Sequence, residues 1–431
     1  MRFFFDAVYL LLALVYLPLV ILRRKLHRGF AMRLGFLKKS VSKETAGAGP
    51  VWIHAVSVGE AMVARRFLEE LRPKLSGKRF VISTVTATGN AIAKGMAGKE
   101  DTVIYSPLDL SFIVEKAVCR IRPSLFICVE TEIWPNLIAC LRRKGIPVAV
   151  INARISDGSF GGYRLFKFLF RRTFASLSLV CAQTDLDRRR LAQLGVPEER
   201  IVVTGNMKFD FSPRANPAVA QVLTDSAQEL LWVCGSTHPG EEEVLTRVYK
   251  NVSARFPQLK LLIAPRHPER AASVSQLLAR HGFGPRRISG LAQGQARSAG
   301  SNEVYVLDTV GELFSYYRQA AFVFIGGSLV KHGGQNLLEP ASLAKPVIFG
   351  PHMFNFRQVA ELFLQNNAAL MIRDADDLEQ KVTLLLTDIP LREKLGQRAQ
   401  KVMRENQGAT KETAARITEL YGNHGPANTK D

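Results

Sequence analysis

Short apolar runs alternate with amphipathic segments along most of this chain, and this alternation narrows the possible folds more than any other feature. The first series of apolar runs, each ending in turn residues, covers residues 51–56, 80–85, 102–105, 125–129, 148–151, 179–182 and 201–203. Helical patterns lie between them at residues 60–75, 88–96, 110–120, 134–143, 165–176 and 185–194. Apolar strands that alternate with amphipathic helices predict an open parallel sheet with helices on both faces.

A second series of the same kind follows a polar stretch at residues 211–227, which we interpret as an interdomain linker. Its candidate strands cover residues 230–234, 260–264, 304–307, 322–325, 347–349 and 369–372. A chain of 431 residues is too long for one ordinary domain. The sequence therefore predicts an α/β protein with two doubly wound, Rossmann-like domains, residues 51–210 and 228–421, that face a cleft. Residues 422–431 are expected to form a tail.

The N-terminal segment, residues 3–22, is almost wholly apolar and is interrupted only by Asp6 and Pro18. Such a segment is long enough to cross a bilayer or to embed in it. It is followed at once by Arg23, Arg24, Lys25, His27, Arg28 and Arg33. The positive-inside rule then places the body of the protein in the cytoplasm. We expect residues 1–24 to be an uncleaved membrane anchor and residues 25–50 a basic linker. A cleaved signal peptide is the alternative, but it requires small residues where this chain has arginines.

The charge balance indicates an anionic partner, since 58 basic and 38 acidic residues give a net charge of +20. That partner is a nucleic acid, a membrane surface or a phosphorylated substrate. Residues 163–172 mix phenylalanines with arginines and a lysine. This run either lies on the bilayer, with its arginines on lipid phosphates, or is a buried amphipathic helix whose arginines reach solvent. The five cysteines include no CxxC pair, which favours buried, reduced thiols.

Ligands of open parallel sheets bind at the carboxyl ends of the strands, so chemistry is expected there. Glu60 lies in the first turn of a predicted helix, directly after the strand at residues 51–56 and a turn that holds Ser57 and Gly59. The positive end of the helix dipole favours its ionised form, which suits a general base. An ordinary first-turn helix acid is the plainer interpretation.

Two other strand ends carry charged residues. Glu130 and Glu132 follow the run at residues 126–129, and Lys208 ends the first half of the chain. Two carboxylates in one cleft separate their pKa values, which suits acid and base work. A lysine at the interdomain cleft neutralises charge on a leaving group or a substrate. The plainer interpretations are a helix-start acid and a solvated hinge lysine.

A nucleotide site is predicted in the second half, although the chain has neither GxGxxG after its first strand nor GxxxxGK[ST]. The strand at residues 322–325 enters a glycine-rich loop that leads to a helix holding Glu339. Backbone amides at such a helix start bind phosphate, and Glu339 can accept from ribose hydroxyls. Arg266 ends a buried strand as a candidate phosphate clamp. The alternative is that these glycines only form turns. The DxD at residues 185–187 is better explained by helix capping than by a metal.

Taken together, the motifs resemble a known family. They lie at residues 54–60, 130–136, 152–156, 205–210, 235–238, 265–268, 326–328 and 336–339. The series is similar to the 3-deoxy-D-manno-octulosonic acid (Kdo) transferases of Gram-negative bacteria, a GT-B glycosyltransferase family, and it extends from the anchor to about residue 420.

The resemblance implies inverting, metal-independent transfer of Kdo from CMP-Kdo to a lipid A precursor, lipid IVA, in lipopolysaccharide core biosynthesis. The reaction would take place at the cytoplasmic face of the cell inner membrane. Glu60 would be the general base, while Glu130 and Lys208 would stabilise the transition state. CMP would be held by Pro265, Arg266, Val310, Gly311, Glu312, Asn336, Leu337, Leu338 and Glu339. No cofactor and no metal are implied.

The expected partners are therefore CMP-Kdo, the lipid A precursor and anionic lipids of the inner membrane, with no nucleic acid. Two alternatives remain open. One is a sugar-nucleotide epimerase of GT-B-like fold, a soluble class that has no use for an anchor. The other is a membrane-tethered protein that binds anionic lipid or nucleic acid without catalysis, in which case the polar strand ends are incidental.

Overall fold

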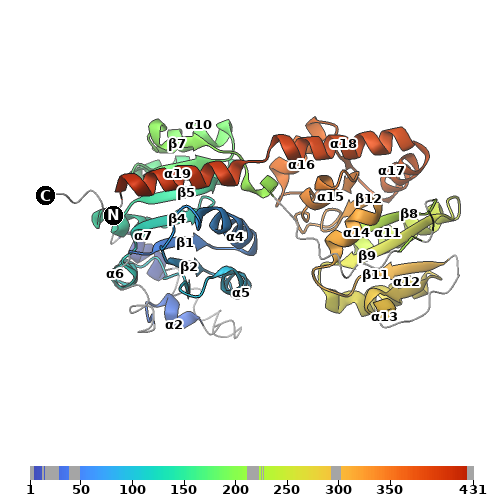
Figure 1. Ribbon diagram of the computed structural model, residues 1–431, viewed down its shortest axis with the longest axis horizontal. Coiled ribbons are helices and arrows are strands. Elements are labelled where there is room, and N and C mark those ends of the chain that lie inside the picture. The colour runs from blue at the N-terminus through green and yellow to red at the C-terminus, as the bar shows by residue number, and fades with distance from the viewer. Residues whose placement is uncertain are drawn as a thin grey trace. The chain divides into compact units, whose positions relative to one another are not determined.

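The computed structural model describes residues 4–11, 14, 29–37, 49–210, 223–224, 226, 228–292 and 302–424. The chain divides into two compact units (Figure 1). Unit 1 comprises Met1–Asp210 and Gln407–Asp431, and unit 2 comprises Phe211–Asn406. The chain therefore leaves unit 1 after Asp210 and returns to it at Gln407.

Unit 1 contains, among its described residues, a seven-stranded parallel sheet in the order β3-β2-β1-β4-β5-β6-β7. Its strands are β1 (Val51–Ala55), β2 (Phe80–Thr84), β3 (Thr102–Tyr105), β4 (Leu125–Val129), β5 (Val148–Ala153), β6 (Leu179–Ala182) and β7 (Ile201–Val203). The strand order reverses between the neighbours β1 and β4. In open α/β sheets this reversal opens the crevice in which ligands bind.

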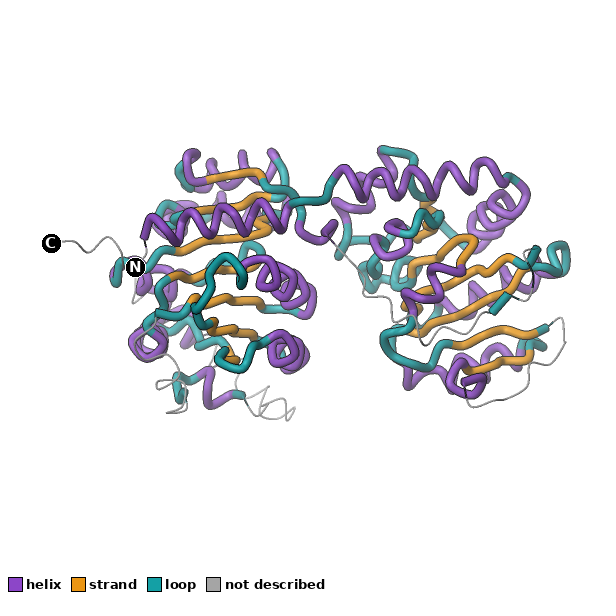
Figure 2. The backbone as a smooth tube through the Cα atoms, in the orientation of Figure 1, coloured by secondary structure: helices purple, strands orange, loops and turns teal. Residues whose placement is uncertain are grey.

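Helices cover both faces of this sheet (Figure 2). They are α2 (Phe30–Arg33), α4 (Val58–Leu71), α5 (Ala87–Met96), α6 (Ser111–Ile121), α7 (Pro135–Arg143), α8 (Asp157–Leu165), α9 (Lys167–Phe174), α10 (Asp185–Leu194) and α19 (Ala409–His424). Trp52 belongs to the core under α6, α7, α9 and α10. Its neighbours Val51 and Ile53 belong to the core under α4, α5 and α19. Because both faces are buried, the strands are mostly apolar, which explains the sequence pattern.

Unit 2 contains a second parallel sheet, which has seven strands among the described residues, in the order β10-β11-β9-β8-β12-β13-β14. Its strands are β8 (Leu230–Thr237), β9 (Leu259–Pro265), β10 (Gly284–Arg287), β11 (Glu303–Val306), β12 (Ala320–Ile325), β13 (Val347–Phe349) and β14 (Leu370–Met371). Its helices are α11 (Glu241–Ser253), α12 (Ala271–Arg280), α13 (Ile288–Ala292), α14 (Leu313–Gln319), α15 (Leu338–Ser342), α16 (Arg357–Gln365), α17 (Ala375–Thr387) and α18 (Ile389–Glu405). Here the strand order reverses between β8 and β12.

The end of the second unit differs from the expected boundary at residue 421. Helix α19 belongs to unit 1, where its apolar residues Ala414 and Ile417 join the core under α4. The periodicity of residues 409–424 marks an apolar stripe but does not show which core the stripe covers. The expected linker at residues 211–227 lies almost entirely outside the described residues.

The N-terminal residues 4–11 are helical and contact unit 1. Asp6, which interrupts the apolar segment, accepts hydrogen bonds from the Ser111 N–H at 2.8 Å and from Asn136 Nδ2 at 3.0 Å. The ring of Phe5 packs against that of Phe170, with centroids 5.7 Å apart. In the part of the chain that is described, no helix has the length and apolar character needed to cross a membrane. Residues 12–13 and 15–28, which include much of the expected anchor, lie outside that part.

Candidate functional site

The carboxylate of Glu60 is folded back over the start of α4, where it lies 6% exposed. Its Oε2 accepts the Val56 N–H at 2.7 Å, and its Oε1 accepts the Ser57 hydroxyl at 2.8 Å. Ser57 caps the helix in return, since its Oγ accepts the Glu60 N–H at 3.2 Å. This reciprocal arrangement is a variant of the capping box. It fixes the carboxylate at the carboxyl end of β1.

Burial raises the pKa of Glu60, and the hydrogen bonds from Val56 and Ser57 oppose that shift. The negative charge of Glu130 raises the pKa further. A raised pKa makes the carboxylate a stronger base once it is ionised.

Glu130 directly follows β4, the neighbour of β1, and its backbone is left-handed, with φ of +59°. Its Oε1 lies 3.0 Å from Nζ of Lys208. Lys208 belongs to the 3-10 helix η2 (Met207–Asp210), at the end of the first segment of unit 1. Both side chains are about a quarter exposed, at 26% and 23%, so the pair is accessible to a substrate.

Glu132 adds a third carboxylate. Burial raises its pKa to about 7, and the charges of Glu60 and Glu130 contribute to the shift. Sequence reasoning paired this residue with Glu130 for acid and base work but did not include it among the predicted catalytic residues. The structure thus brings Glu60, Glu130 and Lys208 into one electrostatic group at the β1–β4 reversal, and Glu132 joins them. Three carboxyl groups thus share this region with one ammonium.

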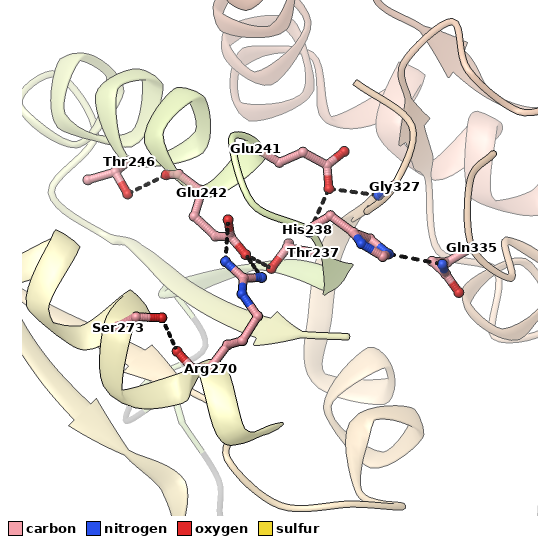
Figure 3. Close-up of polar contacts among 9 residues, drawn as sticks. All are labelled: Thr237, His238, Glu241, Glu242, Thr246, Arg270, Ser273, Gly327 and Gln335. Carbon is pink, nitrogen blue, oxygen red and sulfur yellow. Dashed lines mark hydrogen bonds and ion pairs between the residues drawn. The ribbon is translucent and has the colours of Figure 1, made fainter. Parts of the chain in front are cut away.

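The glycine-rich loop after β12 in unit 2 is occupied by a carboxylate of the protein itself (Figure 3). Glu241, the first residue of α11, accepts four backbone N–H groups. The donors are His238 at 2.9 Å, Gly327 at 2.7 Å, Ser328 at 3.0 Å and Leu329 at 2.9 Å. These amides are therefore unavailable to a phosphate. Sequence reasoning missed Glu241, whose only signal is the acidic run at residues 241–243 after a strand end.

Around this carboxylate lies a polar cluster at the carboxyl end of β8 (Figure 3). The ring of His238 stacks on that of His332, with centroids 4.2 Å apart, and its Nε2 lies 3.2 Å from Nε2 of Gln335. Burial and the neighbouring histidines lower the pKa of His238 to about 4, so the ring is neutral at pH 7. Arg270 pairs with the buried Glu242 at 2.8 Å.

The residues predicted to hold CMP lie at or after the carboxyl ends of β9, β11 and β12. In the sheet, β9 and β12 flank β8, and β11 lies next to β9. Arg266 follows β9, donates its N–H to the Thr237 carbonyl at 2.9 Å and has an exposed side chain. Val310, Gly311 and Glu312 follow β11, and Val310 is 84% exposed. Asn336 Nδ2 donates to Glu339 Oε1 at 3.1 Å.

A few of these predicted residues are buried. Leu337 and Leu338 have side chains that are 0% and 1% exposed, so they can offer a ligand only their backbone. Burial raises the pKa of Glu339, and the hydrogen bond from Asn336 opposes the shift.

A metal site is not found among the described residues, which contain no group of three or more His, Cys, Asp or Glu side chains able to hold an ion. Within the DxD at residues 185–187, Asp187 is fully buried. Its Oδ1 accepts the Ile155 N–H at 2.9 Å, and its own N–H donates to Thr184 Oγ1. Its carboxylate therefore has a structural role.

Comparison with solved structures identifies the architecture. A UDP-GlcNAc 2-epimerase from Neisseria meningitidis, bound to UDP-GlcNAc, superposes with a TM-score of 0.56 at 13% identity, covering 86% of this chain and 99% of that one. An MnaA–UDP structure from S. aureus gives a TM-score of 0.53 at 13% identity, covering 88% and 98% of the two chains. At such low identity the likeness shows only the fold, which is GT-B-like.

Comparison of sequences identifies the family. A family model described as 3-deoxy-D-manno-octulosonic-acid transferase matches residues 28–211. The 3-deoxy-D-manno-octulosonic acid transferase of Haemophilus influenzae is 34% identical over 420 residues, covering 95% of this chain and 96% of that protein. The enzyme of the same name from Bordetella pertussis is 32% identical over 390 residues, covering 87% and 88%. This chain therefore belongs to the 3-deoxy-D-manno-octulosonic acid transferases, the Kdo-transferring glycosyltransferases of lipopolysaccharide biosynthesis.

Proposed function

We propose that this Kdo transferase uses CMP-Kdo as its donor and a lipid A precursor, lipid IVA, as its acceptor, with inversion at the transferred carbon and Glu60 as the general base. The observation that carries the proposal is the pairing of Glu130 with Lys208 beside the buried carboxylate of Glu60, at the β1–β4 reversal of unit 1. General-base catalysis and charge stabilisation are the two contributions that such a transfer requires.

Glu60 takes the proton of the acceptor hydroxyl. The hydroxyl oxygen bonds to the anomeric carbon of Kdo while the bond from that carbon to the phosphate oxygen of CMP breaks. Attack from the face opposite CMP inverts the configuration. The carboxylate of Glu130 stabilises an oxocarbenium-like transition state, and the ammonium of Lys208 stabilises the negative charge that develops on the leaving CMP.

CMP is assigned to unit 2. The exposed guanidinium of Arg266 after Pro265 binds the phosphate, and the turn at residues 310–312 contributes backbone groups. Glu339, oriented by Asn336, accepts from ribose hydroxyls, while Leu337 and Leu338 contribute only their backbone because their side chains are buried.

A membrane surface is assigned to α8 and α9. Leu165 and Phe168 are each 73% exposed, whereas Phe170 turns inward against Tyr163, with ring centroids 5.1 Å apart. The exposed side chains favour a helix pair that lies on the bilayer over one buried in the protein, with Arg164 and Arg171 beside lipid phosphates. We assign the N-terminal segment, residues 1–24, to an anchor at the cytoplasmic face of the inner membrane.

The central test replaces the base. We expect Glu60→Gln to lower kcat for Kdo transfer from CMP-Kdo to lipid IVA by about 10²- to 10⁴-fold. CMP release and the mass of the lipid product are measured together. The control is Glu69→Gln on the same helix, because Glu69 is exposed and, among the described residues, forms its ion pair with Arg65 at 3.5 Å. Undiminished transfer by Glu60→Gln would exclude Glu60 as the base, and CMP release without a lipid product would exclude lipid IVA as the acceptor.

A further inference from the structure

The 3-10 helix η2 lies at the point where both chain connections between the units join unit 1. The chain leaves unit 1 immediately after Asp210 and returns at Gln407. The returning segment is bonded to η2, since Gln407 Nε2 donates to the Phe209 carbonyl at 3.4 Å. Lys208, the proposed catalytic cation, therefore lies in the same short helix that both chain connections adjoin.

Asp210 makes the strongest link between the two connections. Its Oδ1 accepts the Gly408 N–H at 2.5 Å, and its Oδ2 accepts the Thr410 N–H at 2.5 Å. Both donors lie at the start of α19, whose first amides have no partner within the helix. A carboxylate at this end of a helix is also favoured by the helix dipole. Asp210 is thus the N-terminal cap of α19, supplied from a distant part of the chain.

The other end of η2 is fixed to the sheet. Asn152, in the last two residues of β5 and with φ of +53°, accepts the Met207 N–H through its Oδ1 at 3.0 Å. Asn206 Oδ1 accepts the Lys208 N–H at 3.0 Å. Arg66 of α4 donates to the Asp210 carbonyl at 2.7 Å. The backbone of Lys208 is therefore held between the sheet, α4 and α19.

We propose that Asp210 is a positioning residue that holds Lys208 against Glu130, so that the placement of the cation depends on both chain connections to unit 2. The proposal rests on the role assigned to Lys208 under the proposed function. If the bonds of Asp210 to Gly408 and Thr410 are lost, η2 keeps its sheet contacts and the Gln407–Phe209 bond but loses its two bonds to the start of α19. Lys208 then samples positions away from Glu130. A small displacement of a catalytic group lowers kcat without weakening the binding of a substrate elsewhere.

Loss of a cap that only stabilises a helix is expected to lower stability without lowering kcat. A second helix cap in the chain allows this comparison. Asp374 caps α17 in unit 2, where its Oδ1 accepts the Asp377 N–H at 2.9 Å. Asp374→Ala removes a helix cap that has no connection to Lys208, so it serves as the matched control.

The experiment measures kcat and KM for CMP-Kdo in Asp210→Ala, Asp210→Asn, Lys208→Met and the double variant Asp210→Ala/Lys208→Met. We expect Asp210→Ala to lower kcat by about 10- to 100-fold, with KM changed by less than about twofold. Asp210→Asn keeps one acceptor oxygen and is expected to recover part of the loss. In the Lys208→Met background, Asp210→Ala is expected to change kcat by less than about threefold, because interacting residues have non-additive effects.

Three results would overturn the proposal. Fully additive losses in the double variant, or an equal loss of kcat in Asp374→Ala, would show that Asp210 acts only as a structural cap. If Lys208→Met alone keeps full kcat, the proposed role of Lys208 fails first, and the role of Asp210 fails with it. Should Asp210→Ala not fold, Asp210→Asn in the two Lys208 backgrounds supplies the same comparison.

Discussion

Nζ of Lys208 lies 3.0 Å from Oε1 of Glu130, and Glu130 makes this contact from a left-handed backbone with φ of +59°. A residue other than glycine is strained in this conformation by about 1–2 kcal/mol. The ion pair itself, with both side chains about a quarter exposed, stabilises the fold by about 0–1 kcal/mol. The ion pair therefore does not clearly outweigh the strain at Glu130, which is consistent with the catalytic role proposed for this residue.

The first prediction separates strain from function by comparing Glu130→Gly with Glu130→Ala. Both remove the carboxylate, so both are expected to lower kcat by about 10²- to 10³-fold. Only glycine relieves the left-handed backbone, so Glu130→Gly is expected to be more stable than Glu130→Ala by about 1 kcal/mol in chemical denaturation. Equal stability of the two variants would show that the backbone relaxes without glycine.

A second prediction concerns the pH dependence of kcat. The pKa of Glu132 is raised to about 7, chiefly by burial and then by the charges of Glu60 and Glu130. As the pH rises through 7, Glu132 ionises and makes Glu60 a stronger base, so kcat is expected to rise through this range. Glu132→Gln is expected to remove that rise in kcat. The fall in kcat at low pH that comes from protonation of Glu60 is expected to remain. A rise near pH 7 that persists in the variant would assign it to another group.

The third prediction applies the same shift to stability. An acid whose pKa is raised in the folded state binds more protons there than in the unfolded state between about pH 4.5 and 7. Stability is therefore lost as the pH rises through this window, and the loss is complete above 7. Glu132→Gln is expected to be more stable than the natural protein at pH 8, by about 1–3 kcal/mol, and not at pH 4. Urea unfolding at the two pH values measures the difference.

The fourth prediction concerns Glu241, whose carboxylate accepts four backbone N–H groups from two segments. Glu241→Gln places an amide group against N–H donors and leaves at least one buried donor unsatisfied. We expect it to destabilise unit 2 by about 2–4 kcal/mol. The control is Glu243→Gln on the same helix, because Glu243 is exposed and, within the part of the chain that is described, its carboxylate bonds to His281 at 2.8 Å. Equal unfolding midpoints would show that the loop keeps its conformation without the carboxylate.

The parallel sheets were predictable because both faces of their strands are buried, which leaves apolar runs in the sequence. Strand β10 escaped prediction, since its residues, Gly284–Arg287, pair only at the edge of the sheet and are not buried. The unit to which α19 belongs was not predictable either, because an apolar stripe shows that a helix packs but not on what.

The grouping of Glu60, Glu130 and Lys208 followed from a simple rule, that parallel strands bring their carboxyl ends to one edge. The contacts of Glu241 and Asp210 follow no such rule. Three of the four donors to Glu241 lie 86 to 88 residues away along the chain, and the two donors to Asp210 lie 198 and 200 residues away. A backbone N–H has no side chain to mark it in a sequence.

The last prediction tests the membrane surface of α8 and α9. Leu165→Ser with Phe168→Ser removes two side chains that are each 73% exposed, so the fold is expected to be unaffected. If these side chains enter the bilayer, their loss weakens binding by about 1–3 kcal/mol in total, or roughly 5- to 150-fold. Transfer to lipid IVA embedded in vesicles of phosphatidylethanolamine and phosphatidylglycerol is expected to fall accordingly, while transfer to lipid IVA dispersed in detergent stays unchanged. Ile389→Ser, at an exposed apolar residue of unit 2, is the control and is expected to affect neither assay. A parallel fall in both assays would place the two residues in acceptor binding instead, because detergent removes the bilayer but leaves the acceptor.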